Sequence, residues 1–98
     1  MRIDFDWDPA KEAINLAKHG VAFEQAMGVF RDPLARSVPD YSEGEERWVT
    51  MGETGVGNLL VVVHTWTELN PDQSYVRIIS ARRPTPNETR QYREDRIP

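Results

Sequence analysis

The stretch LLVVVHTW, residues 59–66, holds the longest apolar run of the chain, Leu59 to Val63. β-Branched and aromatic residues dominate it, and a short run of this kind between turn residues is typical of a buried strand. We expect residues 59–66 to form the central strand of a β-sheet. The apolar run is far shorter than the roughly 20 residues that span a bilayer, so it predicts no membrane segment.

Further strands are predicted on both sides of this segment. Glu46 to Gly52 and Ser74 to Ala81 both show strand-like patterns. Turns at residues 53–58 and 70–72 join them to the central run in chain order, which favours an antiparallel meander. Two more strands are expected from shorter patterns: residues 34–38 and, at an edge of the sheet, residues 2–7.

Capping residues predict a first helix over residues 9–19. Asp8 is a good N-cap, Pro9 suits the first helical position, and Gly20 supplies a left-handed residue after the last turn. The apolar residues of this segment fall on one face, which an amphipathic helix normally buries: Ala10, Ala13, Ile14 and Ala17.

Two other helices are expected. One covers residues 21–30 and is stopped by Asp32-Pro33, with an apolar stripe of Phe23, Ala26, Met27 and Phe30. The other follows the last strand, is capped by Thr85 or Asn87, and runs to about Asp95.

This order of elements separates the helices from an antiparallel sheet, which defines the α+β fold class. We expect one domain over residues 1–98, with an N-terminal helical hairpin and a C-terminal helix packed on the sheet.

Composition narrows the functional classes. The chain has no cysteine, which excludes disulfides, thiol nucleophiles and thiolate zinc sites. The first residues contain no apolar signal core, so we expect a cytoplasmic protein. The net charge of −4 is unevenly distributed. Residues 77–98 carry six arginines against three acidic residues, and such an end can either bind phosphate or form an ordinary solvated helix.

Several motifs, in order and at fixed spacing, resemble those of the BrnT family of toxins. They are DWDPAK (residues 6–11), NLAKHGV (15–21), VFRDP (29–33), Glu46-Arg47, RIISARR (77–83), Glu88 and Tyr92. Two departures are Ala22, where a serine would complete a capping box, and residues 67–74, which we expect to form a loop that is long for the family's tight hairpin.

The resemblance implies a RelE-like fold and metal-independent cleavage of RNA, with no cofactor. It also implies a BrnA-type antitoxin partner that is a ribbon–helix–helix protein. The toxin and antitoxin would form a heterotetramer, and the toxin would reach operator DNA only through the antitoxin.

RNA cleavage without a metal needs a base, an acid and cations that stabilise the crowded phosphate. Arginine suits the cationic task because it stays charged and binds phosphate oxygens in a bidentate manner. Histidine suits proton transfer, and a terminal tyrosine assists in RelE-like toxins. The candidate catalytic residues are therefore His19, Arg47, His64, Arg77, Arg82 and Tyr92.

Each candidate also has a plain structural alternative. His19 can be a cation at a helix C-terminus, and His64 can be a core residue because it is in phase with Leu60 and Val62. Strand arginines can form ion pairs. Candidate RNA-binding residues are Lys11, Lys18 and Arg83, although the stripe with Lys11, Asn15 and Lys18 can equally contact an antitoxin or solvent.

Two functions remain open from the sequence. The first is a ribonuclease toxin. The second is a non-catalytic interaction module that binds a DNA-binding partner through an apolar strip and the tryptophans Trp7, Trp48 and Trp66. Arginines that converge in one concave site favour the enzyme, and arginines dispersed into ion pairs favour the module.

Overall fold

A computed structural model describes residues 1–42, 44, 46–55 and 57–94. Its elements, in chain order, are β1 (Arg2–Asp6), α1 (Pro9–His19), α2 (Phe23–Ala26), the 3₁₀ helix η1 (Met27–Arg31), β2 (Arg36–Asp40), β3 (Arg47–Glu53), β4 (Leu59–His64), β5 (Thr67–Asn70), β6 (Gln73–Arg82) and α3 (Pro86–Glu94). The α+β class predicted from the sequence is confirmed. The predicted end of the last helix, at about Asp95, lies outside the described residues.

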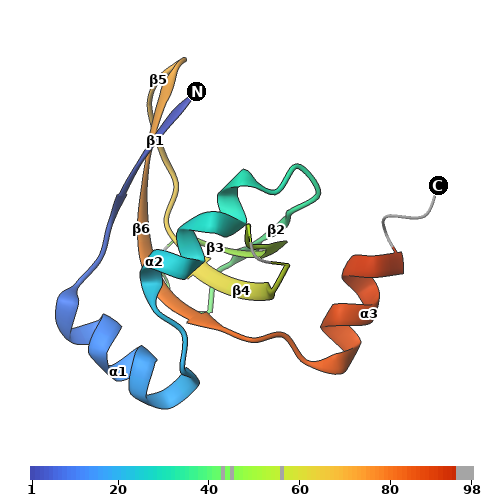
Figure 1. Cartoon of the computed structure of the whole chain (residues 1–98). Coiled ribbons are helices and arrows are strands. Elements are labelled where there is room, and N and C mark those ends of the chain that lie inside the picture. The colour runs from blue at the N-terminus through green and yellow to red at the C-terminus, as the bar shows by residue number, and fades with distance from the viewer. Residues whose placement is uncertain (43, 45, 56, 95–98) are drawn as a thin grey trace.

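The strands form one sheet in the order β1-β6-β4-β3-β2, and β5 also pairs with β6. The meander of β3, β4 and β6 is antiparallel as predicted. β1 is an edge strand, also as predicted, but it runs parallel to β6. The sheet is therefore mostly, not wholly, antiparallel (Figure 1).

The segment 67–74 was expected to be a long loop, and this expectation is wrong. Thr67–Asn70 forms β5, which pairs with the first residues of β6 across a turn at Asn70 to Gln73. The pairing of β4 with β6 shifts register between Val63 and His64, which leaves Ile79 of β6 as the extra residue of a β-bulge. The sequence pattern did not predict this strand because all four of its residues are exposed. A strand is recognised from the alternation of polar and apolar residues that one buried face produces.

The core lies between the sheet and the segment α2–η1. Val21, Phe23, Ala26 and Val29 pack on strand residues Leu60, Val62, Val76, Ile78 and Ala81. The predicted helix over 21–30 is in fact a short α-helix that continues as a 3₁₀ helix. Gly52 allows this close packing, because a Cβ there would lie 2.9 Å from Val29 Cγ1.

The first helix has the predicted bounds, but the face that was predicted to be buried is exposed. Its apolar residues face outward, with Ile14 66 % exposed, whereas Asn15 is buried. The Asn15 amide accepts a hydrogen bond from the Ala81 N–H at 3.1 Å and donates to the Ala81 carbonyl at 2.8 Å. It also donates to the Val21 carbonyl at 3.0 Å. Asn15 thus occupies the part of the β6 edge that β1 does not reach, and hydrogen bonding overrides the hydrophobic pattern.

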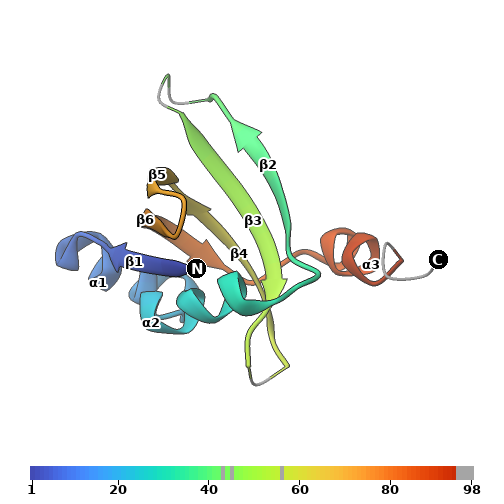
Figure 2. The same cartoon turned by 90° about the horizontal axis from the view of Figure 1, so that it is seen from above.

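The last helix, α3, lies on the far side of the molecule from α1 (Figures 1 and 2). Thr85 is its N-cap, since Thr85 Oγ1 accepts from the Glu88 N–H at 3.2 Å and Glu88 Oε1 accepts from the Thr85 N–H at 2.8 Å. Of the two predicted caps, Thr85 is therefore the one used. Within the described residues, no helix is long and apolar enough to cross a membrane.

Candidate functional site

Four strand arginines project from one face of the sheet, which we call the arginine face: Arg36, Arg47, Arg77 and Arg82. Strand register defines a row across this face, because Arg36 pairs with Met51, Met51 with Val61, and Val61 with Arg82. Neighbouring strands lie about 4.8 Å apart, so the backbones of Arg36 and Arg82 are separated by roughly 14 Å. Two cations therefore bracket an apolar floor.

A cleft of about 410 Å³ lies over this row, between the sheet and α3. Val38, Val49, Met51 and Val61 form its apolar floor, Arg36 lines one side, and Glu88 and Gln91 come from α3. The cleft thus combines an apolar surface with a cation and a carboxylate.

Arg82 is held at this cleft by Glu88. Its Nη1 and Nη2 atoms lie 2.8 and 3.0 Å from the two carboxylate oxygens of Glu88, which is a bidentate pair. These hydrogen bonds are the main cause that lowers the pKa of Glu88 to about 2, and the backbone N–H of Thr85 adds to the effect. The same carboxylate therefore caps α3 and neutralises Arg82.

Arg77 lies nearer the β1 side of the sheet. Its Nη1 is 2.8 Å from Asp6 Oδ2, which also accepts a hydrogen bond from the Tyr75 hydroxyl at 2.8 Å. The Tyr75 hydroxyl is the main cause that holds the pKa of Asp6 below its usual value. Arg47 begins β3 at the opposite side, in register with Asp40. The arginines share a face but do not converge on one point.

His64 lies on the opposite face, in contact with the core. It is 2 % exposed, and its ring packs edge-on against Phe30 with centroids 4.7 Å apart. Nδ1 lies 2.8 Å from the Thr65 carbonyl and Nε2 lies 2.6 Å from Thr50 Oγ1. Burial lowers the pKa of His64. The structure does not bring this histidine together with the arginines.

The other predicted site residues are dispersed. Lys11 and Lys18 are exposed on α1 and His19 is half-buried at its last position, on the other side of the molecule from α3 (Figure 1). Arg83 is exposed after β6, and its carbonyl accepts from Arg82 Nη1 at 3.2 Å.

Tyr92 is buried and links α3 to the segment that follows η1. Its hydroxyl donates to Asp32 Oδ2, which also accepts from the Glu53 N–H at 2.8 Å. Asp32 Oδ1 accepts from the Leu34 N–H at 2.9 Å. This geometry gives Tyr92 a clear packing role and places its hydroxyl away from the lining of the cleft.

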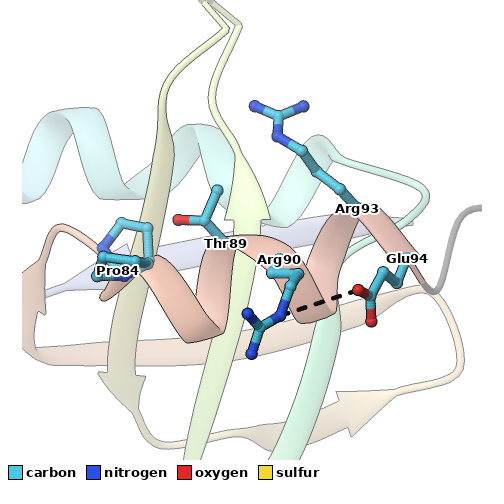
Figure 3. Close-up of a pocket in the computed structure, with 6 residues that line it drawn as sticks. Pro84, Thr89, Arg90, Arg93 and Glu94 are labelled. Atoms are coloured by element: carbon cyan, nitrogen blue, oxygen red, sulfur yellow. Dashed lines mark ion pairs between the residues drawn. The ribbon is translucent and has the colours of Figure 1, made fainter.

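A second cationic area lies on the outer side of α3. Pro84, Pro86, Thr89, Arg90, Arg93 and Glu94 line a shallow hollow of about 560 Å³. Arg90 Nε lies 3.8 Å from Glu94 Oε1, and Arg93 points away from this pair (Figure 3). This area is open to solvent and contains none of the strand arginines.

Sequence reasoning missed Arg36 and the role of Glu88. Arg36 was detectable in principle, because it alternates with Val38 on a strand next to Val49 and Met51. Glu88 stands out in the sequence only as one residue of the BrnT-like motifs, and its pairing with Arg82 depends on how the chain turns into α3.

The molecule is thus an α+β domain whose sheet carries an arginine face partly covered by the C-terminal helix. Residues 7–88 match the family described as ribonuclease toxin, BrnT, of type II toxin–antitoxin systems. The chain belongs to the BrnT family of ribonuclease toxins. This membership implies an antitoxin partner.

The fold agrees with this assignment. The chain is similar to the crystal structure of the Brucella abortus ribonuclease toxin BrnT, with a TM-score of 0.62 and 21 % identity. The likeness covers 87 % of this chain and 99 % of that one. No curated protein matches the chain. The RelE-like character of the fold stays a prediction.

Proposed function

We propose that this chain is a metal-independent endoribonuclease and that the cleft on its arginine face binds the RNA backbone. The observation that carries the proposal is the cross-strand row in which Arg36 and Arg82 bracket an apolar floor beneath α3. Arginine binds phosphate oxygens in a bidentate manner, and the aliphatic floor can pack against the apolar faces of sugars and bases. The family assignment supplies RNA as the substrate class.

The reaction is an attack of the ribose 2′-oxygen on the adjacent phosphorus. The O2′–P bond forms, the P–O5′ bond breaks, and the products are a 2′,3′-cyclic phosphate and a 5′-hydroxyl. A base takes the 2′-proton and an acid delivers a proton to O5′. Arg82 and Arg36 stabilise the additional negative charge on the phosphate, and Arg47 and Arg77 bind flanking phosphates.

Among the described residues that line the cleft, Glu88 is the titratable acid, so we assign it the role of base. A phosphate that binds Arg82 competes with Glu88 for the guanidinium. Once Arg82 turns to the phosphate, Glu88 loses the hydrogen bonds that chiefly lower its pKa. Its carboxylate then becomes a stronger base beside the reacting group.

Cleavage of a defined single-stranded RNA in excess EDTA, resolved on a gel, tests this function. We expect the wild type to cleave and the double variant Arg77→Ala/Arg82→Ala to be inactive. Arg2→Ala/Arg90→Ala is the matched control, because it also removes two arginines that pair with carboxylates, Asp4 and Glu94, elsewhere on the surface. Equal cleavage by the two double variants would contradict the assignment.

For the partner, we propose a BrnA-type ribbon–helix–helix antitoxin that forms a heterotetramer with this chain and contacts operator DNA for it. Co-expression with a BrnA-type ribbon–helix–helix protein, followed by size-exclusion chromatography with light scattering, is the test. Recovery of the toxin as a monomer from that co-expression would contradict the proposal.

The interaction module is a second candidate, favoured by one observation. Arg77 and Arg82 both already have carboxylate partners, Asp6 and Glu88. A protein that binds the antitoxin normally but never cleaves RNA, with or without ribosomes, would fit this second function.

A further inference from the structure

Another pocket lies on the sheet face opposite the arginine face. Ser37, Trp48, His64 and Trp66 line it, and its volume is about 270 Å³. Pockets for drug-sized molecules measure roughly 300–1,000 Å³, so this one has room for a single flat ring system. We call it the tryptophan pocket.

A hydrogen-bond chain at its base has a defined direction. A carbonyl can only accept, so His64 Nδ1 carries the proton that is donated to the Thr65 carbonyl. In the neutral ring Nε2 must then accept from the Thr50 hydroxyl, 2.6 Å away. The Thr50 oxygen in turn accepts from the Ser37 hydroxyl at 2.7 Å. The Ser37 hydroxyl therefore donates its only proton to Thr50, and Ser37 Oγ can act only as a hydrogen-bond acceptor for a ligand in the pocket.

The walls of the pocket are aromatic. Trp66 is 38 % exposed, and it lies beside Phe30 with ring centroids 6.5 Å apart. Trp48 is half-buried on β3. An uncharged planar ligand that stacks on an indole and donates one hydrogen bond matches this surface.

The position of the pocket connects it to the arginine face. On β2, Arg36 and Ser37 are consecutive and point to opposite faces, and on β3 the same holds for Arg47 and Trp48. β2 is the last strand of the sheet. A flexible RNA strand held by Arg36 or Arg47 can therefore turn around this edge and place one base on the other face.

We propose that the tryptophan pocket is a subsite for one unpaired nucleobase that carries an amino group, stacked on Trp66 and hydrogen-bonded to Ser37 Oγ. The proposal rests on the proposed function for the source of the base, which is the RNA substrate. An indole side chain from a protein partner is the competing occupant. The RNA base is favoured because the family acts on RNA and cations adjoin the pocket through the same two strands.

Free nucleosides test the pocket without phosphate and without cleavage. Adenosine and purine riboside, which lacks the amino group, are titrated into ¹⁵N-labelled full-length protein, and the indole N–H signals of the tryptophans are followed by NMR. We expect adenosine to shift the signals of Trp48 and Trp66 and to bind about 2- to 10-fold more tightly than purine riboside, as one hydrogen bond allows.

Variants locate the binding. Trp66→Ala should weaken adenosine binding by about 5- to 100-fold, and Trp66→Phe should retain most of it because the ring still stacks. Ser37→Ala should make adenosine and purine riboside bind equally. Tyr41→Ala is the control, since Tyr41 is also an exposed aromatic residue, at 70 %, but does not line the pocket.

Three results would overturn the proposal: no shift of the Trp48 and Trp66 signals, unchanged affinity in Trp66→Ala, or shifts caused by N-acetyltryptophanamide and not by adenosine. The last would assign the pocket to a protein partner. None of these readouts depends on catalysis, so the subsite can fail while the cleavage assay succeeds, and the reverse.

Discussion

A single amide, that of Asn15, joins the first helix to the sheet. It makes three buried hydrogen bonds to backbone atoms of Ala81 and Val21. Asn15→Ala leaves these groups without partners, so we expect a loss of about 2–3 kcal/mol in the free energy of unfolding. Urea unfolding followed by circular dichroism measures it. Lys11→Ala on the exposed side of the same helix should change the value by less than about 0.5 kcal/mol, and an equally small effect of Asn15→Ala would refute this role.

The buried ring of His64 predicts a pH dependence of stability. Its folded pKa is lowered by burial, so the unfolded chain binds the proton more readily. The full contribution of His64 is present above its ordinary pKa of about 6.5 and is lost progressively as the pH falls below that value. The loss approaches about 1.4 kcal/mol per pH unit at its steepest.

Urea unfolding of the wild type and of His64→Gln between pH 7.5 and 5 isolates this effect. We expect the wild type to lose more stability over the range than the variant. The carboxylates whose pKa is lowered, such as Asp6 and Glu88, stay charged in the folded state over this range and do not confuse the comparison. If the free energy of unfolding falls equally with pH in both proteins, protonation of His64 does not destabilise the folded state and the prediction is wrong.

At the scale of elements, α3 is both a structural helix and a cover over the cleft. Glu88→Gln keeps one oxygen, which can still accept from the Thr85 N–H, but it removes the charge and replaces the oxygen that accepts from Arg82 Nη2 with an NH2 donor. We expect the free energy of unfolding to fall by about 0.5–1 kcal/mol, since the pair is partly exposed. RNA affinity should rise about 5-fold because Arg82 is released, while cleavage falls by about 100-fold or more if Glu88 is the base.

Glu94→Gln is the matched control for this change, because Glu94 also pairs with an arginine of α3 but on its outer side. It should alter neither affinity nor cleavage. Filter binding and single-turnover cleavage separate the two effects of Glu88→Gln. If affinity and cleavage both rise, Glu88 restricts access to the cleft and is not the base.

The elements themselves were largely predictable from the sequence, and their relative positions were less so. Local signals placed α1 at its observed bounds, because Asp8 and Gly20 mark its ends. They could not show that Asn15 would face inward. Its orientation depends on the backbone of Ala81, which β1 does not pair with and which is 66 residues away in the sequence. The four-residue β5 was missed because both its faces are polar or exposed.

The same distinction applies to the candidate site. The suitability of arginine for binding phosphate identified Arg47, Arg77 and Arg82 as candidates, and they share one sheet face with Arg36. The sequence offered His64 beside them because chain order does not show on which side of a sheet a residue lies. Asp6, the partner of Arg77, is 71 residues away in the sequence, and the pairing of Arg82 with Glu88 depends on how the chain turns into α3, so both pairs are visible only in the fold.

At the scale of the whole molecule, the proposed function requires an acidic protein to bind a polyanion through its arginine face. The net charge is −4, so long-range attraction does not assist RNA, and binding depends on local exchange of ion pairs. Each phosphate neutralised on single-stranded nucleic acid contributes about −0.7 to the slope of log affinity against log salt concentration. The slope therefore counts the arginines that take part.

If Arg77 and Arg82 leave Asp6 and Glu88 to join Arg36 and Arg47, four phosphates are contacted and the slope should be about −3. If Arg77 and Arg82 stay paired with Asp6 and Glu88, these two arginines contribute nothing and the slope should be shallower by about 1.4. We expect the steeper value, measured by fluorescence anisotropy of a labelled RNA between low and moderate salt. Arg82→Ala should then reduce the slope by about 0.7, and Arg90→Ala, on the outer side of α3, should leave it unchanged. A shallow slope that Arg82→Ala does not alter would mean that the ion pairs persist in the complex, and the cleft would then be a protein-binding surface in place of an RNA-binding one.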